Sequence, residues 1–191
     1  MDALVSTCRS YRRFSAGAPV ETATLKELVS LARRAPSAAN RQPLKYVLSG
    51  SAEMNARIFP TLAWAAYFKD WPGPETNERP AAYIVVLLDT TITQSADVDV
   101  GIAAQTILLA ATERGLGGCM LGGIKRDQLG EVLRLPPHLT ISLVIALGKP
   151  VERVVLEDLP ADGSIKYYRG PDGTHHVPKR ALADLIHAVY G

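Results

Sequence analysis

Three short segments, far apart in the chain, contain residue types that bind anionic or planar ligands. The first, residues 8–14 (CRSYRRF), places the guanidinium groups of Arg9, Arg12 and Arg13 close to the hydroxyl of Ser10. Guanidinium groups donate paired hydrogen bonds to phosphate oxygens, and serine adds a further donor. The segment therefore predicts a phosphate site. A solvated run of charge at a helix end has the same composition and is the alternative.

The second segment, residues 35–43 (APSAANRQP), connects a predicted helix to a predicted strand. Its small side chains let a planar ligand approach the backbone. The amides of Asn40 and Gln42 both donate and accept hydrogen bonds, which suits the imide edge of a heterocyclic ring. An ordinary loop rich in turn-forming residues is the alternative.

The third segment, residues 115–123 (GLGGCMLGG), follows a long predicted helix. Gly122 and Gly123 come directly after a short predicted strand, where glycine exposes backbone N–H groups to a ligand atom. A plain turn or bulge is the commoner explanation of a lone glycine cluster.

Hydrophobic periodicity predicts the elements that must position these segments. Helices are expected over residues 2–8, 24–35, 51–59, 97–114, 125–133 and 179–190, and strands over 44–48, 82–89, 119–121 and 140–147. The continuous apolar run at 82–89 predicts a central strand that is covered on both faces. The helix over 97–114 has few polar positions, so it is expected to be largely buried. Residues 151–160 are expected to form a surface return.

Composition limits the function classes that remain. A chain of 191 residues predicts one domain over residues 1–191, and 47% hydrophobic with 21% charged residues is typical of a globular protein. The net charge of +2 gives no reason to expect nucleic acid or a membrane surface as a partner. No apolar run spans a membrane and the first residues lack a secretory leader, so a cytoplasmic location is expected. Two cysteines support neither a disulfide framework nor an iron–sulfur cluster, and G-x-G-x-x-G and P-loop sequences are absent.

Taken together, in this order and spacing, RSYRRF, APSAANRQP, GLGGCMLGG and the C-terminal VPKRAL resemble the nitroreductase family of flavin-dependent oxidoreductases. The resemblance extends over the whole chain. It implies an α+β, nitroreductase-like fold with a mixed, mainly antiparallel sheet flanked by helices. It also implies an intertwined homodimer with two FMN molecules at the subunit interface.

The resemblance also implies which residues bind the cofactor. These are Arg9, Ser10, Arg12, Pro36, Ser37, Ala38, Asn40, Gln42, Leu121, Gly122, Gly123, Lys179 and Arg180. The N-terminal group is expected at the phosphate, ribityl chain and pyrimidine side of FMN. Pro36, Ser37 and Ala38 are expected to line the flavin from the partner subunit, and Asn40 to hydrogen-bond the flavin or its chain. Gln42 is the weaker candidate, because its role in the family can be structural.

By the same resemblance, Leu121, Gly122 and Gly123 lie at the flavin ring, and a backbone N–H, from Gly122, points at N5. Either Lys179 or Arg180 closes the phosphate site from the C-terminal end. The chain departs from the family pattern at one position, since Cys8 stands where the first of two arginines is usual. Arg13 or Arg41 is a candidate to supply the missing contact.

The activity implied is hydride transfer from NADH or NADPH to flavin N5, and then to a small electron-poor acceptor such as a nitroaromatic or a quinone, by ping-pong kinetics. Arg12 is expected to stabilise the negative charge of the reduced flavin, and no side chain is assigned as a catalytic acid or base. The alternatives are another flavin reaction on the same fold (dehydrogenase, dehalogenase or flavin-fragmenting) and a non-catalytic FMN-binding protein.

Two further clusters lie outside the motifs that carry the resemblance. The aromatic residues Trp64, Tyr67, Phe68 and Trp71 either shape a substrate channel or pack in the core. The adjacent pair His175-His176 would point to opposite sides of a strand, so no shared metal is expected, and both are expected at the surface.

Overall fold

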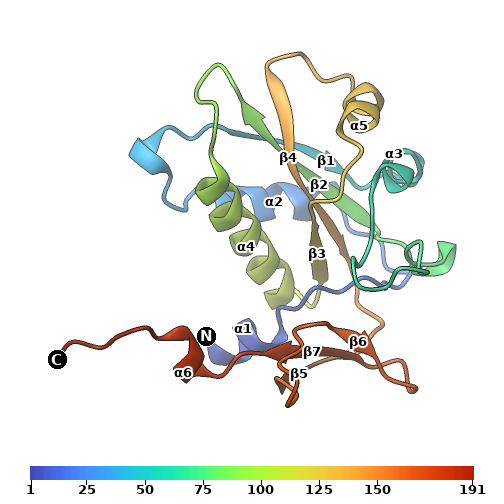
Figure 1. Ribbon diagram of the computed structural model, residues 1–191. Helices are drawn as coiled ribbons and strands as arrows, with labels where there is room; N and C mark the ends of the chain where they lie inside the picture. Colours follow the sequence, from blue (N-terminus) through green and yellow to red (C-terminus); the bar gives the residue numbers. More distant parts are fainter.

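A four-stranded antiparallel sheet forms the centre of the computed structural model, which describes residues 1–191 (Figure 1). Its strands lie in the order β1-β2-β4-β3, with bounds β1 Leu44–Ser49, β2 Ala82–Asp89, β3 Gly117–Leu121 and β4 Leu139–Gly148. Every residue of β2 is buried. The prediction of a central strand at 82–89 is therefore confirmed.

Helices cover both faces of this sheet, because β2 and β4 are apolar on both sides. Ala82, Ile84 and Val86 of β2 pack against α2 (Thr22–Ala32) and α4 (Asp97–Glu113). The alternate residues Tyr83, Val85 and Leu87 face a second cluster, to which α3 (Ala52–Ile58) and α5 (Arg126–Leu133) contribute. The period of two along a strand thus divides one apolar run between two hydrophobic cores.

The helices before the small sheet agree with the predicted ranges within a few residues. α3 begins after Ser51, whose hydroxyl accepts a hydrogen bond from the backbone N–H of Met54 at 3.4 Å. α2 begins at Thr22, earlier than expected. α4 is less buried than expected, since only one side of it packs on α2 and the sheet while Val98, Gly101 and Gln105 are exposed. None of the helices combines the length and apolar character needed to cross a lipid bilayer.

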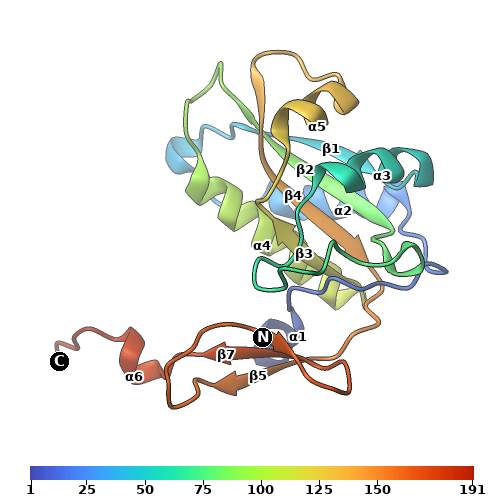
Figure 2. The same ribbon diagram turned by 45° about the vertical axis from the view of Figure 1, so that its right-hand side comes forward.

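The C-terminal part of the chain forms a second, smaller sheet, here called the small sheet. It consists of β5 (Val154–Asp158), β6 (Tyr168–Arg169) and β7 (His175–Lys179), in the order β5-β7-β6. β7 pairs in parallel with β5 and antiparallel with β6. Figure 2 shows the small sheet as a layer beside α1 (Asp2–Thr7), below the C-terminal end of α4.

Two sequence predictions are wrong in this region. Residues 151–160 contain a strand rather than only a surface return. The helix expected over 179–190 is reduced to α6 (Leu182–Leu185), because Lys179 is the last residue of β7 and pairs with Asp158. Residues 186–191 extend away from the body of the molecule, and a short segment without packing contacts has little to stabilise a helix (Figure 1).

Gly118 of β3 provides a test of how tightly the sheet and α4 are packed. A Cβ atom there would lie 2.6 Å from the carbonyl oxygen of Ala146 and 2.6 Å from Cδ2 of Leu108. We expect Gly118→Ala to lower the free energy of unfolding by about 1–3 kcal/mol, because both neighbours must move. Urea denaturation of the protein without added ligand measures the change. Gly122→Ala is the matched control, since no atom lies within 4 Å of its added Cβ. Equal stability of the two variants would contradict this packing.

Candidate functional site

The N-terminal basic segment, residues 8–14, is held along the edge of the central sheet. Ser10 forms a parallel bridge to Gly118, and the backbone N–H of Tyr11 donates to the carbonyl of Gly118 at 3.0 Å. Further along, Phe14 is completely buried and its ring lies about 3 Å from the position that a Cβ on Gly148 would take. A Cβ on Gly117 would likewise lie 2.5 Å from Cδ2 of Tyr11, so the absence of side chains at Gly117 and Gly148 lets the segment lie close to β3 and β4.

This placement produces a cavity of about 310 Å³ between the basic segment, α4 and the small sheet, here called the basic cavity. Three cations, Arg9, Arg12 and Lys179, line it together with the hydroxyl of Ser10. The Nε atoms of Arg9 and Arg12 are buried without a hydrogen-bond partner. A buried donor without a partner costs free energy, so the cavity is built to accept an anionic group.

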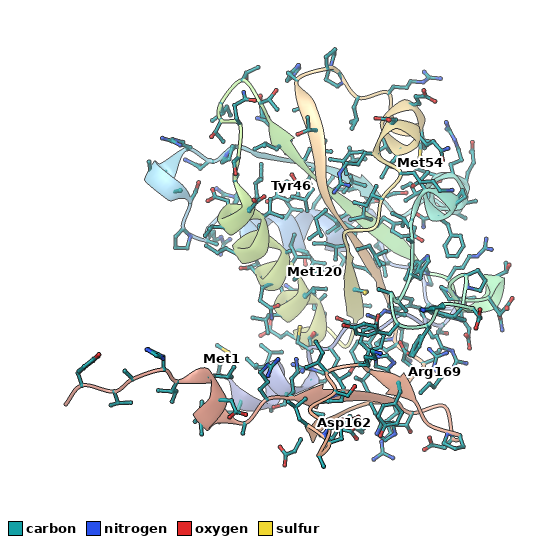
Figure 3. The ribbon with its side chains drawn as sticks, in the orientation of Figure 1. Met1, Tyr46, Met54, Met120, Asp162 and Arg169 are labelled. Atoms are coloured by element: carbon teal, nitrogen blue, oxygen red, sulfur yellow. The ribbon has the colours of Figure 1, made fainter.

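A second cavity of about 250 Å³, the glycine cavity, adjoins the basic cavity. The two share Arg12, Met120 and Tyr167 in their walls. Leu121, Gly122 and Gly123 line the glycine cavity opposite residues 63–66. Met120, labelled in Figure 3, lies at the end of β3 beside α4.

The loop group of predicted cofactor residues lies elsewhere on the chain. Pro36, Ser37 and Gln42 line a separate cavity of about 190 Å³, the loop cavity, together with Asp99 of α4. Ala38 lines a neighbouring depression on the same side. The loop includes the short helix η1 (Ala38–Asn40).

Asp99 holds this loop in place. Its buried carboxylate accepts a short hydrogen bond from the hydroxyl of Ser37 and a second, at 3.2 Å, from the backbone N–H of Ala38. The amide of Gln42 donates to Oδ1 of Asn40 at 3.1 Å. Asn40 and Gln42 both have positive φ, 53° and 51°, a conformation that asparagine tolerates better than most residues.

The structure thus brings together two of the three predicted groups and separates the third. Asp99 lines the loop cavity, whereas Gln105 and Leu108 line the basic cavity. Asp99 and Gln105 are about 9 Å apart along α4, at 1.5 Å per residue. Within one chain, the loop and the basic segment therefore lie at different sites along the same helix.

The structure also distinguishes the remaining candidates for the phosphate site. Lys179 lines the basic cavity, whereas Arg180 is exposed and does not. Arg13 does not replace the arginine missing at position 8, because its Nε and Nη2 atoms donate to the Glu78 carboxylate at 2.6 and 2.5 Å. Arg41 lines the depression beside the loop instead.

His175 is a residue of this site that the sequence interpretation missed. The prediction of two surface histidines is wrong, because the His175 side chain is only 1% exposed and lines the basic cavity. The pKa of His175 is lowered to about 4, first by burial and then by the nearby cations Arg12 and Arg169. The period of two along β7, which directs His175, Val177 and Lys179 to the same cavity, is the signal that could have found it.

His176 takes the opposite orientation, as the strand geometry predicts. Its Nδ1 lies 3.0 Å from Oε2 of Glu157, and its ring stacks on Tyr168 with 4.7 Å between centroids. The two adjacent histidines therefore have separate surroundings.

The predicted aromatic cluster is present and includes one more member, Tyr167. The Tyr167 ring lies 4.8 Å from the ring of Tyr67 and 5.3 Å from that of Phe68, between centroids. Trp64 lines the glycine cavity, whereas Phe68 and Trp71 pack against the guanidinium of Arg169 at 5.1 and 5.0 Å. The packing interpretation therefore holds for Phe68 and Trp71, whereas a substrate channel stays a prediction.

Glu152 joins the small sheet to the basic segment. Its side chain is 1% exposed, and its carboxylate accepts hydrogen bonds from the backbone N–H groups of Arg12 and Arg13, the latter at 3.2 Å. Nη2 of Arg169 lies 3.5 Å from its other oxygen (Figure 3 labels Arg169 on the small sheet). One buried carboxylate thus contacts both parts of the chain that form the basic cavity.

Comparison with known proteins identifies the class. The model of the nitroreductase family matches residues 5–149, so the chain belongs to the nitroreductase family, whose members are typically NAD(P)H-dependent FMN oxidoreductases. A 4-nitrobenzoate reductase from Nocardioides sp. is 28% identical over 196 residues, covering 77% of this chain and 79% of the relative.

Solved structures agree on the fold. A nitroreductase family protein from Streptococcus pneumoniae superposes with a TM-score of 0.67 at 20% identity, covering 84% of this chain and 96% of that one. An FMN-dependent nitroreductase from Clostridium difficile gives a TM-score of 0.65 at 22% identity, covering 80% and 89%. The expected α+β nitroreductase-like fold is therefore confirmed.

Replacement of Glu152 tests its role in holding the small sheet. We expect Glu152→Ala to lower the free energy of unfolding by about 3–5 kcal/mol, because it leaves two backbone donors and Arg169 without their buried partner. Denaturant unfolding measures the loss, and limited proteolysis locates it. Glu157→Ala is the control, since Glu157 is a partly exposed residue of the same sheet. A Glu152 variant as stable and as protease-resistant as this control would refute the assignment.

Proposed function

We propose that this chain binds FMN across the basic and glycine cavities and transfers hydride from NADH or NADPH to a small electron-poor acceptor, by ping-pong kinetics. The observation that carries the proposal is the junction of the two cavities at Arg12, with cations on one side and an open glycine turn on the other. This arrangement suits a ligand with an anionic end and a planar end.

The phosphate of FMN would be held in the basic cavity. Arg9 and Lys179 supply charge, and Ser10 supplies a neutral donor. Buried hydrogen bonds from charged groups are stronger than those between neutral groups, and the Nε atom of Arg9 has no competing partner in the protein. These residues bind and orient the ligand and take no part in bond breaking.

The ring system of FMN would lie in the glycine cavity. No atom of the chain lies within 4 Å of the Cβ position of Gly122, so its backbone is open to a ligand atom. When bound, FMN supplies the chemistry of accepting and donating hydride. Arg12 stands where the two cavities meet, and its positive charge would favour the extra negative charge of the reduced ring.

Aromatic side chains beside the glycine cavity support a planar acceptor such as a nitroaromatic or a quinone. Trp64 and Tyr167 line the cavity, and the ring of Tyr67, 43% exposed, packs against Tyr167. Offset or tilted contacts with such rings favour planar molecules. The name of the Nocardioides relative, a 4-nitrobenzoate reductase, supports the same class of substrate.

We further infer that the protein works as a homodimer in which the loop of one subunit, residues 36–42, completes the cofactor site of the other. Two observations support this. The loop lies apart from the basic segment within one chain. The C-terminal arm, residues 182–191, exposes apolar side chains that a second subunit would cover, at 71% for Leu182, 80% for Val189 and 95% for Tyr190.

Anaerobic spectral titration tests the activity. We expect the FMN-loaded protein to lose its flavin absorbance on addition of NADH or NADPH, and to recover it when a nitroaromatic or a quinone follows. We expect Arg9→Gln and Lys179→Gln each to weaken FMN binding about ten- to a hundredfold, since each removes one charge-assisted contact. Arg180→Gln is the control and should bind as the wild type does. A protein that takes up no FMN would overturn the proposal, and a bound flavin that no nicotinamide reduces would indicate a different donor or a non-catalytic binder.

Light scattering on a sizing column tests the dimer. We expect the wild-type chain to elute at twice its 20.6 kDa mass, and Leu182→Asp/Val189→Asp to shift towards the monomer because burying two carboxylates at an interface is costly. Ile165→Asp, which changes an exposed residue outside the arm, is the control. A wild-type monomer at micromolar concentration would contradict the inference.

A further inference from the structure

His175 occupies an unusual position for a histidine in this molecule. It lies at the start of β7, in register between Val154 of β5 and Arg169 of β6. Its ring packs against the rings of Tyr167 and Phe68, at 5.2 and 5.6 Å between centroids. The imidazole is therefore fixed by the backbone of the small sheet and by aromatic packing on its sides.

The contact between His175 and Arg12 defines the hydrogen-bonding role of the imidazole. Nη1 of Arg12 lies 3.4 Å from Nε2 of His175. A guanidinium has donors only, and a neutral imidazole has one donor and one acceptor. Nε2 must therefore be the acceptor, which places the single ring proton on Nδ1. That Nδ1 atom is buried and has no partner within the chain.

The charged groups around the imidazole favour this neutral form. Burial lowers the pKa of His175 most, and Arg12, Arg169 and His176 lower it further. The nearby carboxylate of Glu152 is occupied by the backbone of residues 12 and 13 and by Arg169. No acidic group lies in contact with the His175 ring to stabilise an imidazolium.

We propose that His175 is a positioning residue, which as a neutral acceptor holds the Arg12 guanidinium at the junction of the basic and glycine cavities. This inference rests on the proposed function, because Arg12 is the residue expected to stabilise reduced FMN. Nη1 of Arg12 donates to the carbonyl of Ser10 at 3.2 Å and also lies 3.4 Å from Nε2 of His175. The buried Nε of the same guanidinium has no hydrogen-bond partner within the chain.

The tautomer of His175 gives a test that needs no cofactor. In protein with ¹⁵N-labelled histidine, long-range ¹H–¹⁵N spectra at pH 7 distinguish a protonated Nδ1 from a protonated Nε2. We expect His175 to carry its proton on Nδ1 in the wild type, and to change to the Nε2-protonated form in Arg12→Leu. An imidazolium, or an Nε2-protonated ring in the wild type, would overturn the proposal even if the protein binds FMN.

A pair of substitutions tests the consequence for the cofactor. His175→Leu removes the acceptor, whereas His175→Gln keeps an oxygen acceptor at a similar reach. We expect the affinity of the leucine variant for reduced FMN, relative to oxidised FMN, to fall about tenfold. This corresponds to a midpoint potential about 30 mV lower for a two-electron couple. The glutamine variant should restore most of the wild-type potential. His176→Leu is the matched control, because its ring faces Glu157 and Tyr168 instead.

The outcomes separate this inference from the proposed function. FMN bound by all variants with equal midpoint potentials would refute the positioning role and leave the proposed function intact. Failure of the wild type to bind FMN would refute the proposed function, while the tautomer would still decide whether His175 accepts from Arg12. Unfolding of His175→Leu would be detected by circular dichroism, and the tautomer of His175 in the wild type and in Arg12→Leu then decides the case, since that measurement needs neither a substitution at position 175 nor the cofactor.

Discussion

The rest of the site depends on the contacts that the buried carboxylate of Glu152 makes with the basic segment and with Arg169. A charge removed from water is tolerated only when hydrogen bonds replace its hydration, and here the replacements come from two distant parts of the chain. The backbone N–H groups of residues 12 and 13 are one set of partners, and the guanidinium of Arg169 is the other. Satisfying this one group aligns the basic segment with the small sheet, and the cavity between them is the result.

The same strand geometry acts at two levels in this molecule. In β2, alternation divides an apolar run between two cores, one containing α2 and α4 and the other α3 and α5. In β7, alternation directs His175 and Lys179 into the basic cavity and leaves His176 to pair with Glu157. The alternation in β2 fills two hydrophobic cores. The alternation in β7 places His175, and not its neighbour His176, in the wall of the basic cavity.

The sequence predicted the central elements because their signals are local. The apolar run of β2 and the helix cap at Ser51 are examples, because each signal lies within a few consecutive residues. The small sheet was missed because β5 and β7 pair in parallel across a gap in sequence that no short window contains. His175 was misplaced because the alternation within β7 separates it from His176 but does not say which face of the strand another part of the chain covers. Local sequence patterns also could not predict where Ser37 lies relative to Arg9. Within one chain, Ser37 lines the loop cavity and Arg9 lines the basic cavity.

The separation of 140 residues between Arg12 and Glu152 has a consequence for the order of assembly. During synthesis at about 5–20 residues per second, the basic segment is made roughly 7–28 s before its buried partner. For that interval the cations at residues 9 and 12 have no small sheet to enclose them, and β1 and β2 are both made before the interval ends. A nascent chain can therefore form part of its core long before it can hold a ligand, and arrest before residue 152 leaves the cavity unbuilt.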